Sequence, residues 1–288
     1  MADYLTAEEI LRVVRVAVSL GFRKFRITGG EPLLRPDAPH IVGGMAAIPG
    51  VEAIGLSTNG TRMAELAAIL RRAGVRSVNI SLDALDPVIY RRITGGKVEK
   101  VLAGIKAALD AGFERVKLNT VLLRGLNEGE LWPLVLFAAE HDLALRFIEL
   151  MPVGHAKMTA KAHFLPVTEV MAQLRARDEL IPLPALNLGH GPAKYYRLKQ
   201  AGALVGFIGA MTNQNFCETC NRVRLTFDGK IRPCLGNHCE VDLRALLRSH
   251  ATDDELAAAF RLALSQKPRS HAFGPNYLPC RPMIAIGG

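Results

Sequence analysis

Three cysteines near the end of the chain have a spacing that is typical of a metal site. Cys217, Cys220 and Cys234 stand in the run FCETCNRVRLTFDGKIRPC, residues 216–234, as Cys-x2-Cys-x13-Cys. Two cysteines three positions apart can bind one centre from a tight turn, and a third that returns after a hairpin adds a facing thiolate. The chemistry then depends on what completes the ligand set.

Three kinds of site fit this spacing. A structural zinc ion would take Cys239 or His238 as its fourth ligand. An iron–sulfur cluster is the second kind. A redox-active Cys-x-x-Cys pair fits less well, because the motif does not open a helix after a thioredoxin-like strand. The spacing alone leaves zinc and the iron–sulfur cluster open.

Two arginines follow the second cysteine of this run. Arg222 and Arg224 are two positions apart, so a strand would place both side chains on one face, beside the metal site. Two guanidinium groups so placed can bind a triphosphate, whereas an isolated pair is ordinarily a solvated surface feature. Next to three thiolates, the pair predicts an anion site.

The composition limits the class of protein. The 288 residues, 49% of them hydrophobic, suffice for one large domain, or for a domain of about 150 to 200 residues and a smaller one. All five cysteines lie in the last quarter and no leader opens the chain, which predicts a cytoplasmic setting without disulfides. No apolar run reaches the roughly 18 residues of a membrane span. The net charge of +9 favours anionic partners, although many soluble proteins carry scattered basic residues.

Helical and strand patterns alternate through the first half of the chain. Thr6 caps a helix that stops at Gly21. The predicted strands are 24–29, 52–57, 76–81, 115–123 and 143–150, and the helices between them are 37–47, 61–73, 98–111 and 130–141. Strands separated by helices indicate parallel βα units with right-handed crossovers.

Glycines and polar side chains mark the ends of these strands. They are Thr28-Gly29-Gly30-Glu31-Pro32, Ser57-Thr58-Asn59-Gly60, Ser81-Leu82-Asp83, Lys117 with Asn119, and Arg146 with Glu149, Met151 and Pro152. Each group alone could be an ordinary turn, with Asp83 and Glu149 as surface carboxylates and Met151 in the core. Because the carboxyl ends of parallel strands share one rim, five marked ends together predict a ligand site.

The second half of the chain is less regular. Prolines and glycines interrupt it, with a helix predicted at 167–177 and strands at 193–202 and 203–211. We predict a domain boundary near residue 155, with a small second domain, 156–288, organised around its metal.

The whole chain resembles one known family. The segments RITGGEPLLR, STNGT, VNISLDAL, RGLNE, LRFIELMPVG, FCETCNRVRLT, RPCL and Ile286-Gly287-Gly288 occur in the order found in the GTP 3′,8-cyclases (MoaA) of molybdenum cofactor biosynthesis, which are radical S-adenosylmethionine enzymes. The resemblance covers residues 5–288. It is most specific at the cysteine motif and the double-glycine end, since GGEP and the Ser81 region are shared more widely in this fold.

The resemblance implies roles for individual residues. Positions that contact S-adenosylmethionine are matched by Gly30, Ser81 and Met151, and positions at the GTP site are matched by Arg26, Ser57, Lys117, Arg222 and Arg224, with Ser57 in place of a threonine. Cys217, Cys220 and Cys234 match the ligands of a second 4Fe-4S cluster, whose open iron binds guanine. This displaces the zinc interpretation and leaves Cys239 and Cys280 without a role. The Gly-Gly end resembles a segment that enters the active site.

The implied fold is α/β: a partial, open (βα)6 barrel without its first strand in residues 1–155, and a C-terminal α+β iron–sulfur domain. The implied reaction is that of a lyase. A 5′-deoxyadenosyl radical takes the ribose 3′ hydrogen of GTP, and the carbon radical closes onto C8 of guanine. The implied partners are GTP, S-adenosylmethionine, a reducing electron donor, the next enzyme of the molybdopterin pathway and a possible homodimer, with no membrane and no nucleic acid.

One departure from the family is large. The family binds the cluster that cleaves S-adenosylmethionine through a Cys-x3-Cys-x2-Cys loop, and this chain has no cysteine before Cys217. The first strand, that first 4Fe-4S cluster and an upstream GTP-binding arginine are expected to be missing. We therefore expect that these 288 residues alone do not start the radical reaction and, with an exposed sheet edge, are poorly soluble.

Three interpretations of the chain follow. It is an incomplete version of a working cyclase, or an inactive paralogue that binds GTP at the remaining 4Fe-4S cluster, or a basic zinc-ribbon protein that binds nucleic acid with Cys239 as fourth ligand. The third interpretation explains neither the marked strand ends nor the Gly-Gly end. We prefer the first.

Overall fold

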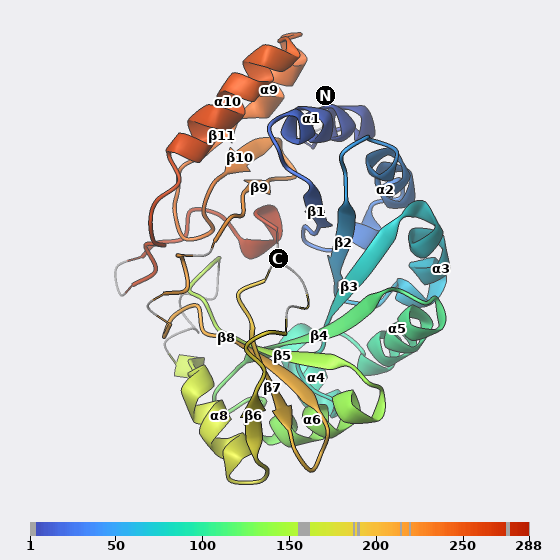
Figure 1. Ribbon diagram of the computed structural model, residues 1–288, viewed down its shortest axis with the longest axis vertical. Coiled ribbons are helices and arrows are strands. Elements are labelled where there is room, and N and C mark those ends of the chain that lie inside the picture. The colour runs from blue at the N-terminus through green and yellow to red at the C-terminus, as the bar shows by residue number, and fades with distance from the viewer. Residues whose placement is uncertain are drawn as a thin grey trace.

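The computed structural model describes residues 4–154, 162–186, 188, 191–213, 215–218, 220–274 and 277–287. One large sheet curves into a partial, open barrel, and a small antiparallel sheet lies beside its first strand (Figure 1). The large sheet has the spatial order β1 (Lys24–Ile27), β2 (Ala53–Thr58), β3 (Val75–Ser81), β4 (Arg115–Leu122), β5 (Ala144–Glu149), β8 (Leu204–Ile208), β7 (Lys194–Leu198) and β6 (Leu180–Pro182). The predicted partial α/β barrel is confirmed.

The parallel part of the sheet places inward-facing side chains level with one another. Strands β1 to β5 and β8 are parallel, whereas β7 and β6 continue the sheet in antiparallel pairing. Asn79 pairs in register with Ser57 on one side and Lys117 on the other, and Arg146 pairs with Asn119. Because β8 follows residue 155, the main sheet draws strands from both sides of the proposed domain boundary.

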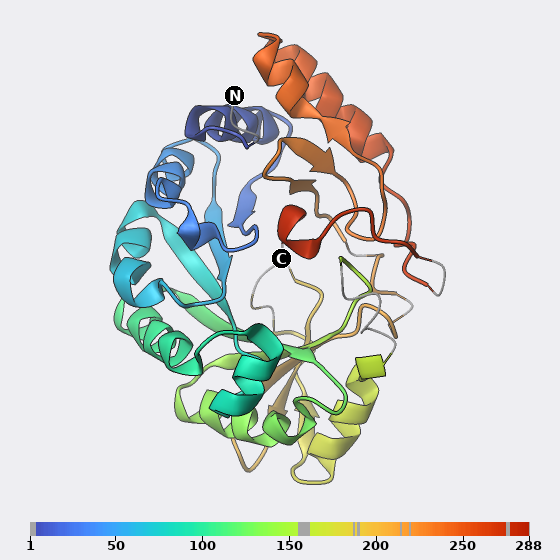
Figure 2. The same ribbon diagram turned by 180° about the vertical axis from the view of Figure 1, so that it is seen from behind.

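Helices cover the outer face of the barrel (Figures 1 and 2). They are α1 (Ala7–Ser19), α2 (Ala38–Ala46), α3 (Met63–Ala73), α4 (Pro87–Thr94), α5 (Val98–Asp110), α6 (Leu131–Glu140) and α8 (Val167–Arg175), with short 3-10 turns η1 (Pro32–Leu34) and η2 (Glu128–Glu130). Thr6 caps α1 as predicted and forms a capping box with Glu9, in which each side chain accepts a hydrogen bond from the other residue's backbone N–H. None of the helices in the described part of the chain has the length and apolar character that crossing a bilayer requires.

The barrel core lies between the sheet and these helices. Side chains of the central strands, among them Leu56, Val78, Ile80, Leu118 and Leu145, are at most 1% exposed. Burial of such side chains stabilises the fold by about 1.5 to 3 kcal/mol each. With its apolar side chains in this core, the sheet can hold polar side chains on its inner face.

The C-terminal elements close around the N-terminal helix. They are β9 (Arg224–Leu225), β10 (Lys230–Arg232), β11 (Val241–Asp242), α9 (Leu243–Arg248), α10 (Asp253–Ser265) and η3 (Met283–Ala285). Val13 and Val16 of α1 share one buried cluster with Ile231, Leu256 and Phe260. This shared core fixes the cysteine-bearing segment relative to β1.

A buried carboxylate holds the end of β5. Glu149 is 1% exposed and accepts hydrogen bonds from the backbone N–H groups of Val167, Met211 and Thr212 and from the Thr212 hydroxyl, at 2.5 to 3.1 Å. The interpretation of Glu149 as a surface carboxylate is therefore wrong. Through these hydrogen bonds, Glu149 joins the start of α8 and the turn after β8 to the rim of the barrel.

Replacing Glu149 with glutamine should lower the melting temperature by roughly 5 to 10 °C, because an amide nitrogen would face N–H donors that now share two carboxylate oxygens. The matched substitution Glu52→Gln removes a carboxylate that is 58% exposed and 4.0 Å from Lys24. It should change the melting temperature by about 1 °C or less. Equal melting temperatures for the two variants would contradict this role of Glu149.

Candidate functional site

Five cations gather on the inner side of the barrel: Lys117 and Arg146 are buried, Arg224 is half-buried, and Arg26 and Arg222 are exposed. Arg26, Lys117 and Arg146 come from β1, β4 and β5, Arg224 comes from β9, and Arg222 precedes it. Their charges interact: Arg146 and Arg222 lower the pKa of Arg26, Arg146 and Arg26 lower the pKa of Lys117, and Arg222 lowers the pKa of Arg224. We call these five residues the cationic cluster. It joins four of the five residues expected at a GTP site, and it adds Arg146.

Four cations of the cluster, Arg26, Lys117, Arg146 and Arg224, have lowered pKa values. Burial, together with the charges of Arg146, Arg26 and Arg115, lowers the pKa of Lys117 to about 7. Its ammonium donates to the Leu188 carbonyl at 2.6 Å. Burial, followed by Arg146 and Arg222, lowers the pKa of Arg26 to about 10. Within the described residues, no carboxylate forms an ion pair with Arg26, Lys117, Arg146 or Arg224. Such a site favours a polyanion.

Ser57, the fifth expected residue, belongs to a polar layer beside the cations. Its hydroxyl oxygen accepts a hydrogen bond from the Asn79 amide at 3.2 Å. The remaining Oδ1 atoms of Asn79 and Asn119 and the Nε atom of Arg146 are buried and have no hydrogen-bond partner among the described residues. Buried polar atoms without a partner are costly, so these three atoms are candidates for contacts with a bound molecule.

Gly30, Ser81 and Met151, expected at an S-adenosylmethionine site, lie on the rim at the carboxyl ends of β1, β3 and β5. The Gly30 loop is held by Glu31, which accepts from the Thr58 hydroxyl and the Asn59 N–H at 2.7 Å each. Of the three, Ser81 pairs in register with Asn119, which pairs with Arg146 of the cationic cluster. Loops at this end of parallel strands are where such folds bind ligands.

The three cysteines of the motif face polar donors. The N–H of Cys220 donates to the Cys217 carbonyl at 3.0 Å, which closes the expected tight turn. The Cys217 sulfur accepts from the His271 N–H at 3.4 Å, and the Cys220 sulfur lies 3.7 Å from the Lys267 ammonium. Lys267 also donates to the Pro233 carbonyl, next to Cys234, and so joins the two halves of the motif.

The thiols also affect one another. Burial raises the pKa of Cys234, and the nearby thiols of Cys217 and Cys220 raise it further. Burial would also raise the pKa of Cys220, but the Arg222 backbone N–H and the charges of Lys267 and Arg222 outweigh it and lower that pKa. Three half-buried thiols with N–H donors and cations beside them form a donor set that fits an iron–sulfur cluster.

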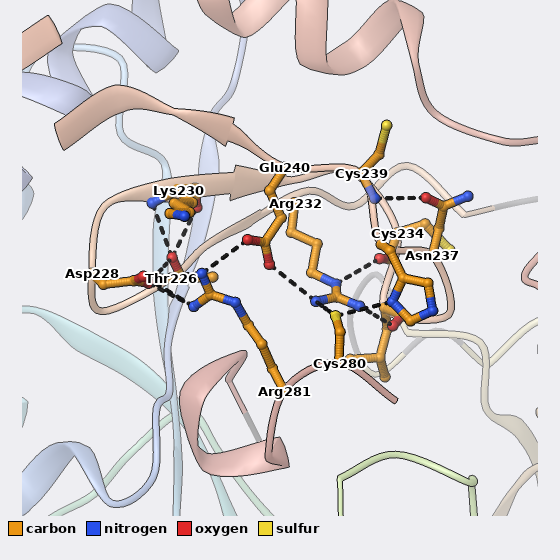
Figure 3. A network of polar contacts seen from close by, with 12 residues as sticks. Thr226, Asp228, Lys230, Arg232, Cys234, Asn237, Cys239, Glu240, Cys280 and Arg281 are labelled. Carbon is orange, nitrogen blue, oxygen red and sulfur yellow. Dashed lines mark hydrogen bonds and ion pairs between the residues drawn. The ribbon is translucent and has the colours of Figure 1, made fainter. Parts of the chain in front are cut away.

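A single zinc ion fits these residues less well. Cys239 donates to the Gln266 side chain at 3.3 Å and points away from Cys234, and His238 contacts the Cys280 sulfur at 2.9 Å (Figure 3). Cys239 is thus not directed at the other thiols, as the fourth ligand of a zinc ion would be.

The C-terminal residues contact the cationic cluster. Arg224 donates to the Gly287 carbonyl at 2.7 Å, and a Cβ atom on Gly287 would lie 3.0 Å from the Thr28 side chain. The φ angle of Gly287 is 88°, a conformation that favours glycine. Gly288, the other half of the double glycine, lies outside the described residues.

Arg146 was predicted at a marked strand end of the ligand site, but not as a partner of Arg222 and Arg224. Two other residues near the site were not predicted. Tyr195 of β7 forms a hydrogen bond with Arg146, and its pKa is raised by burial. Lys267 follows α10 and has no signal in the sequence that separates it from other lysines.

Comparisons with known proteins agree with this geometry. Residues 1–138 match a family model described as the radical SAM superfamily, and residues 143–273 match one described as Molybdenum Cofactor Synthesis C. A GTP 3′,8-cyclase of Pelotomaculum thermopropionicum is 44% identical over 290 residues, which cover 99% of this chain and 88% of that protein. The GTP 3′,8-cyclase of Moorella thermoacetica is 45% identical over 287 residues, with the same coverage.

A solved structure, the [FeFe]-hydrogenase maturase HydG, aligns with 51% of this chain and 36% of its own, with 14% identity and a TM-score of 0.42. That partial likeness adds nothing to the sequence matches. The matches cover both halves of the chain and nearly all of its length. By its sequence the chain belongs to the GTP 3′,8-cyclase family of radical SAM enzymes.

Proposed function

We propose that this protein is a GTP 3′,8-cyclase, which converts GTP to (8S)-3′,8-cyclo-7,8-dihydroguanosine 5′-triphosphate in the first step of molybdenum cofactor synthesis. The observation that carries the proposal is a group of four cations next to three thiols. None of the four, Arg26, Lys117, Arg146 and Arg224, forms an ion pair with a carboxylate among the described residues. Arg224 links the cations to the thiols, since its pKa responds both to Arg222 and to the thiols of Cys220 and Cys234. GTP needs both parts: cations for its triphosphate and a second centre for its base.

In this proposal the cationic cluster binds the triphosphate. Arginine side chains hold phosphate oxygens with paired hydrogen bonds, and each such charge-assisted bond contributes about 1.5 to 3 kcal/mol. Lys117 takes up a proton when the nucleotide binds, because a nearby anion favours the ammonium form. The free amide oxygens of Asn79 and Asn119 are then available to the ribose hydroxyls.

Cys217, Cys220 and Cys234 would hold a 4Fe-4S cluster, and Gly30, Ser81 and Met151 would line the S-adenosylmethionine site. When bound, the cluster offers an iron atom to guanine and S-adenosylmethionine supplies the radical that removes hydrogen from the ribose. The protein orients the ribose between these two sites and excludes water from it. An electron donor, the next enzyme of the pathway and a homodimer belong to the same proposal.

The phosphate part of the proposal predicts that Arg224→Gln weakens GTP binding by about 10- to 100-fold, because the nucleotide loses charge-assisted hydrogen bonds. The measurement is titration calorimetry with anaerobically reconstituted protein. Arg91→Gln on α4, an exposed arginine, is the matched control and should bind GTP as the unsubstituted protein does. Unchanged affinity in Arg224→Gln would contradict the proposed triphosphate site.

The reaction is tested on the protein isolated from its own source, with GTP, S-adenosylmethionine and a strong reductant. Chromatography with mass spectrometry should show a new nucleotide of the same mass as GTP, together with 5′-deoxyadenosine. Recovery of unchanged GTP from protein that contains its clusters would contradict the proposed reaction. Salt-sensitive RNA binding with one zinc ion per chain would instead support the nucleic-acid alternative.

A further inference from the structure

The C-terminal residues 277–287 form a tail that crosses the inner side of the barrel. Figures 1 and 2 show η3, in red, inside the curve of the sheet in both views. A Cβ atom on Gly30 would lie 3.4 Å from Ile284, and one on Gly154 would lie 2.8 Å from the Met283 nitrogen. The tail thus contacts the loops after β1 and β5, and its end reaches Arg224.

Apolar burial fixes only the two ends of this tail. Tyr277 is 6% exposed and Ile286 is 2% exposed, but the 3-10 turn between them has no buried residue. Leu278 and Ile284 are 66% and 69% exposed. The middle of the tail must therefore be held by polar contacts.

Arg281 provides these contacts (Figure 3). Its guanidinium donates to both carboxylate oxygens of Asp228 at 2.9 to 3.0 Å and forms an ion pair with Glu240 at 2.9 Å. The side chains of Arg281, Asp228 and Glu240 are only 19%, 15% and 14% exposed. Paired contacts of this kind, partly withdrawn from water, hold geometry better than exposed ion pairs. We call these three residues the tail anchor.

The tail anchor is continuous with the cysteine motif. Glu240 also pairs with Arg232, which is 1% exposed, at 3.0 Å. Arg232 in turn donates to the carbonyl of Cys234 at 3.2 Å and to that of Leu235 at 3.3 Å. A single chain of charged contacts therefore joins the middle of the tail to the loop of the third cysteine.

We propose that Arg281 is a positioning residue, which holds the tail through Asp228 and Glu240 so that Gly287 lies against Arg224 beside the nucleotide site. Arg281 itself is outside the cationic cluster and acts through the tail. The position of the tail is a property of the protein alone, and only the effect on turnover rests on the proposed function.

The test is hydrogen–deuterium exchange of residues 277–287 in reconstituted protein, read by mass spectrometry of peptides. Arg281→Gln should speed exchange in this segment by roughly tenfold or more, because its anchored state becomes less populated. Asp228→Asn breaks the same contact from β9–β10 with the tail sequence intact and should give the same change. Arg248→Gln removes an ion pair of similar exposure, with Glu9 at 3.3 Å, and should leave tail exchange unchanged.

Two further readouts separate positioning from general destabilisation. Melting temperatures of Arg281→Gln and Arg248→Gln should agree, and in turnover by the protein from its own source kcat should fall roughly tenfold with KM for GTP within threefold. Unchanged tail exchange in both Arg281→Gln and Asp228→Asn, or equal acceleration in Arg248→Gln, would overturn the proposal. If unsubstituted protein fails to bind GTP, the proposed function fails, whereas the exchange result still decides the role of Arg281.

Discussion

Cys220→Ser should remove most of the iron and sulfide that the protein takes up on anaerobic reconstitution, by about tenfold or more. The chain supplies three thiolates to the proposed cluster, and a serine hydroxyl is a poor ligand for iron because it stays protonated at neutral pH. The measurement is iron and acid-labile sulfide per chain, together with the visible absorption of the cluster. The effect should be among the largest of any single substitution, since no other ligand replaces the lost thiolate.

Cys239→Ser is the matched control. Its sulfur donates to Gln266 rather than facing the other thiols, so this variant should keep its iron. The pair of variants also separates the two kinds of metal site. If the motif bound zinc with Cys239 as the fourth ligand, Cys239→Ser would lose metal as Cys220→Ser does, and equal losses would contradict the cluster.

Cys220→Ser also distinguishes the part of the nucleotide site that binds the triphosphate from the part that binds the base. Inorganic triphosphate should bind Cys220→Ser about as tightly as the unsubstituted protein, because the cationic cluster remains. GTP should bind more weakly, because the base loses its iron. Parallel losses for both ligands would mean that the cysteine loop is needed to place the arginines.

The barrel could be predicted from the sequence because its rules are local. The capping box of Thr6 and Glu9 lies within four residues, and each parallel strand carries its own apolar pattern. Helix α4 also has a local signal that was missed, since Asp86 accepts from the N–H groups of Val88 and Ile89 and Pro87 is the first helical residue. α10 has another, the capping box of Thr252 and Glu255.

The rest of the site depends on contacts between distant parts of the chain. The parallel strands predict that Arg146 lies on the same rim as Lys117, but no spacing reveals its proximity to Arg222, which precedes β9. The choice between zinc and a cluster depends on the direction of Cys239, which the Cys-x2-Cys-x13-Cys pattern leaves open. The tail anchor likewise joins residues 53 apart in sequence.

Lys117→Met should have opposite effects on stability and on binding at pH 6. The pKa of Lys117 in the folded protein is about 7, against 10.5 ordinarily, with burial as its first cause. Below pH 7 the side chain is charged in both the folded and the unfolded chain, so the cost of burying the charge is fully present. Between about pH 7 and 10.5 the unfolded chain binds a proton that the folded chain lacks, and this group's contribution to stability rises with pH.

Removing the charge should therefore raise the melting temperature of the nucleotide-free protein at pH 6, and the gain should shrink as the pH rises toward 10. The lost hydrogen bond to Leu188 opposes the gain by about 1 kcal/mol, which is less than the cost that lowers the pKa so far. Lys106→Met, at a lysine whose side chain is 77% exposed, should leave the melting temperature nearly unchanged at both pH values. A lower melting temperature for Lys117→Met at pH 6 would contradict the assigned cost of the buried charge.

GTP binding, unlike stability, should be weakened by Lys117→Met. The triphosphate favours the ammonium form, so binding above pH 7 takes up a proton at Lys117 and the affinity of the unsubstituted protein should fall as the pH rises. Lys117→Met should bind GTP about 10- to 100-fold more weakly at pH 6 and should lose this part of the pH dependence, because the titrating group is gone. Calorimetry in buffers of different ionisation enthalpy measures the proton uptake directly. Equal proton uptake by the two proteins at pH 8 would mean that a group other than Lys117 takes up the proton. Loss of proton uptake in Lys117→Met would show that Lys117 is the group. The cost of burying its amine would then be offset when the charge of the substrate restores the ammonium form.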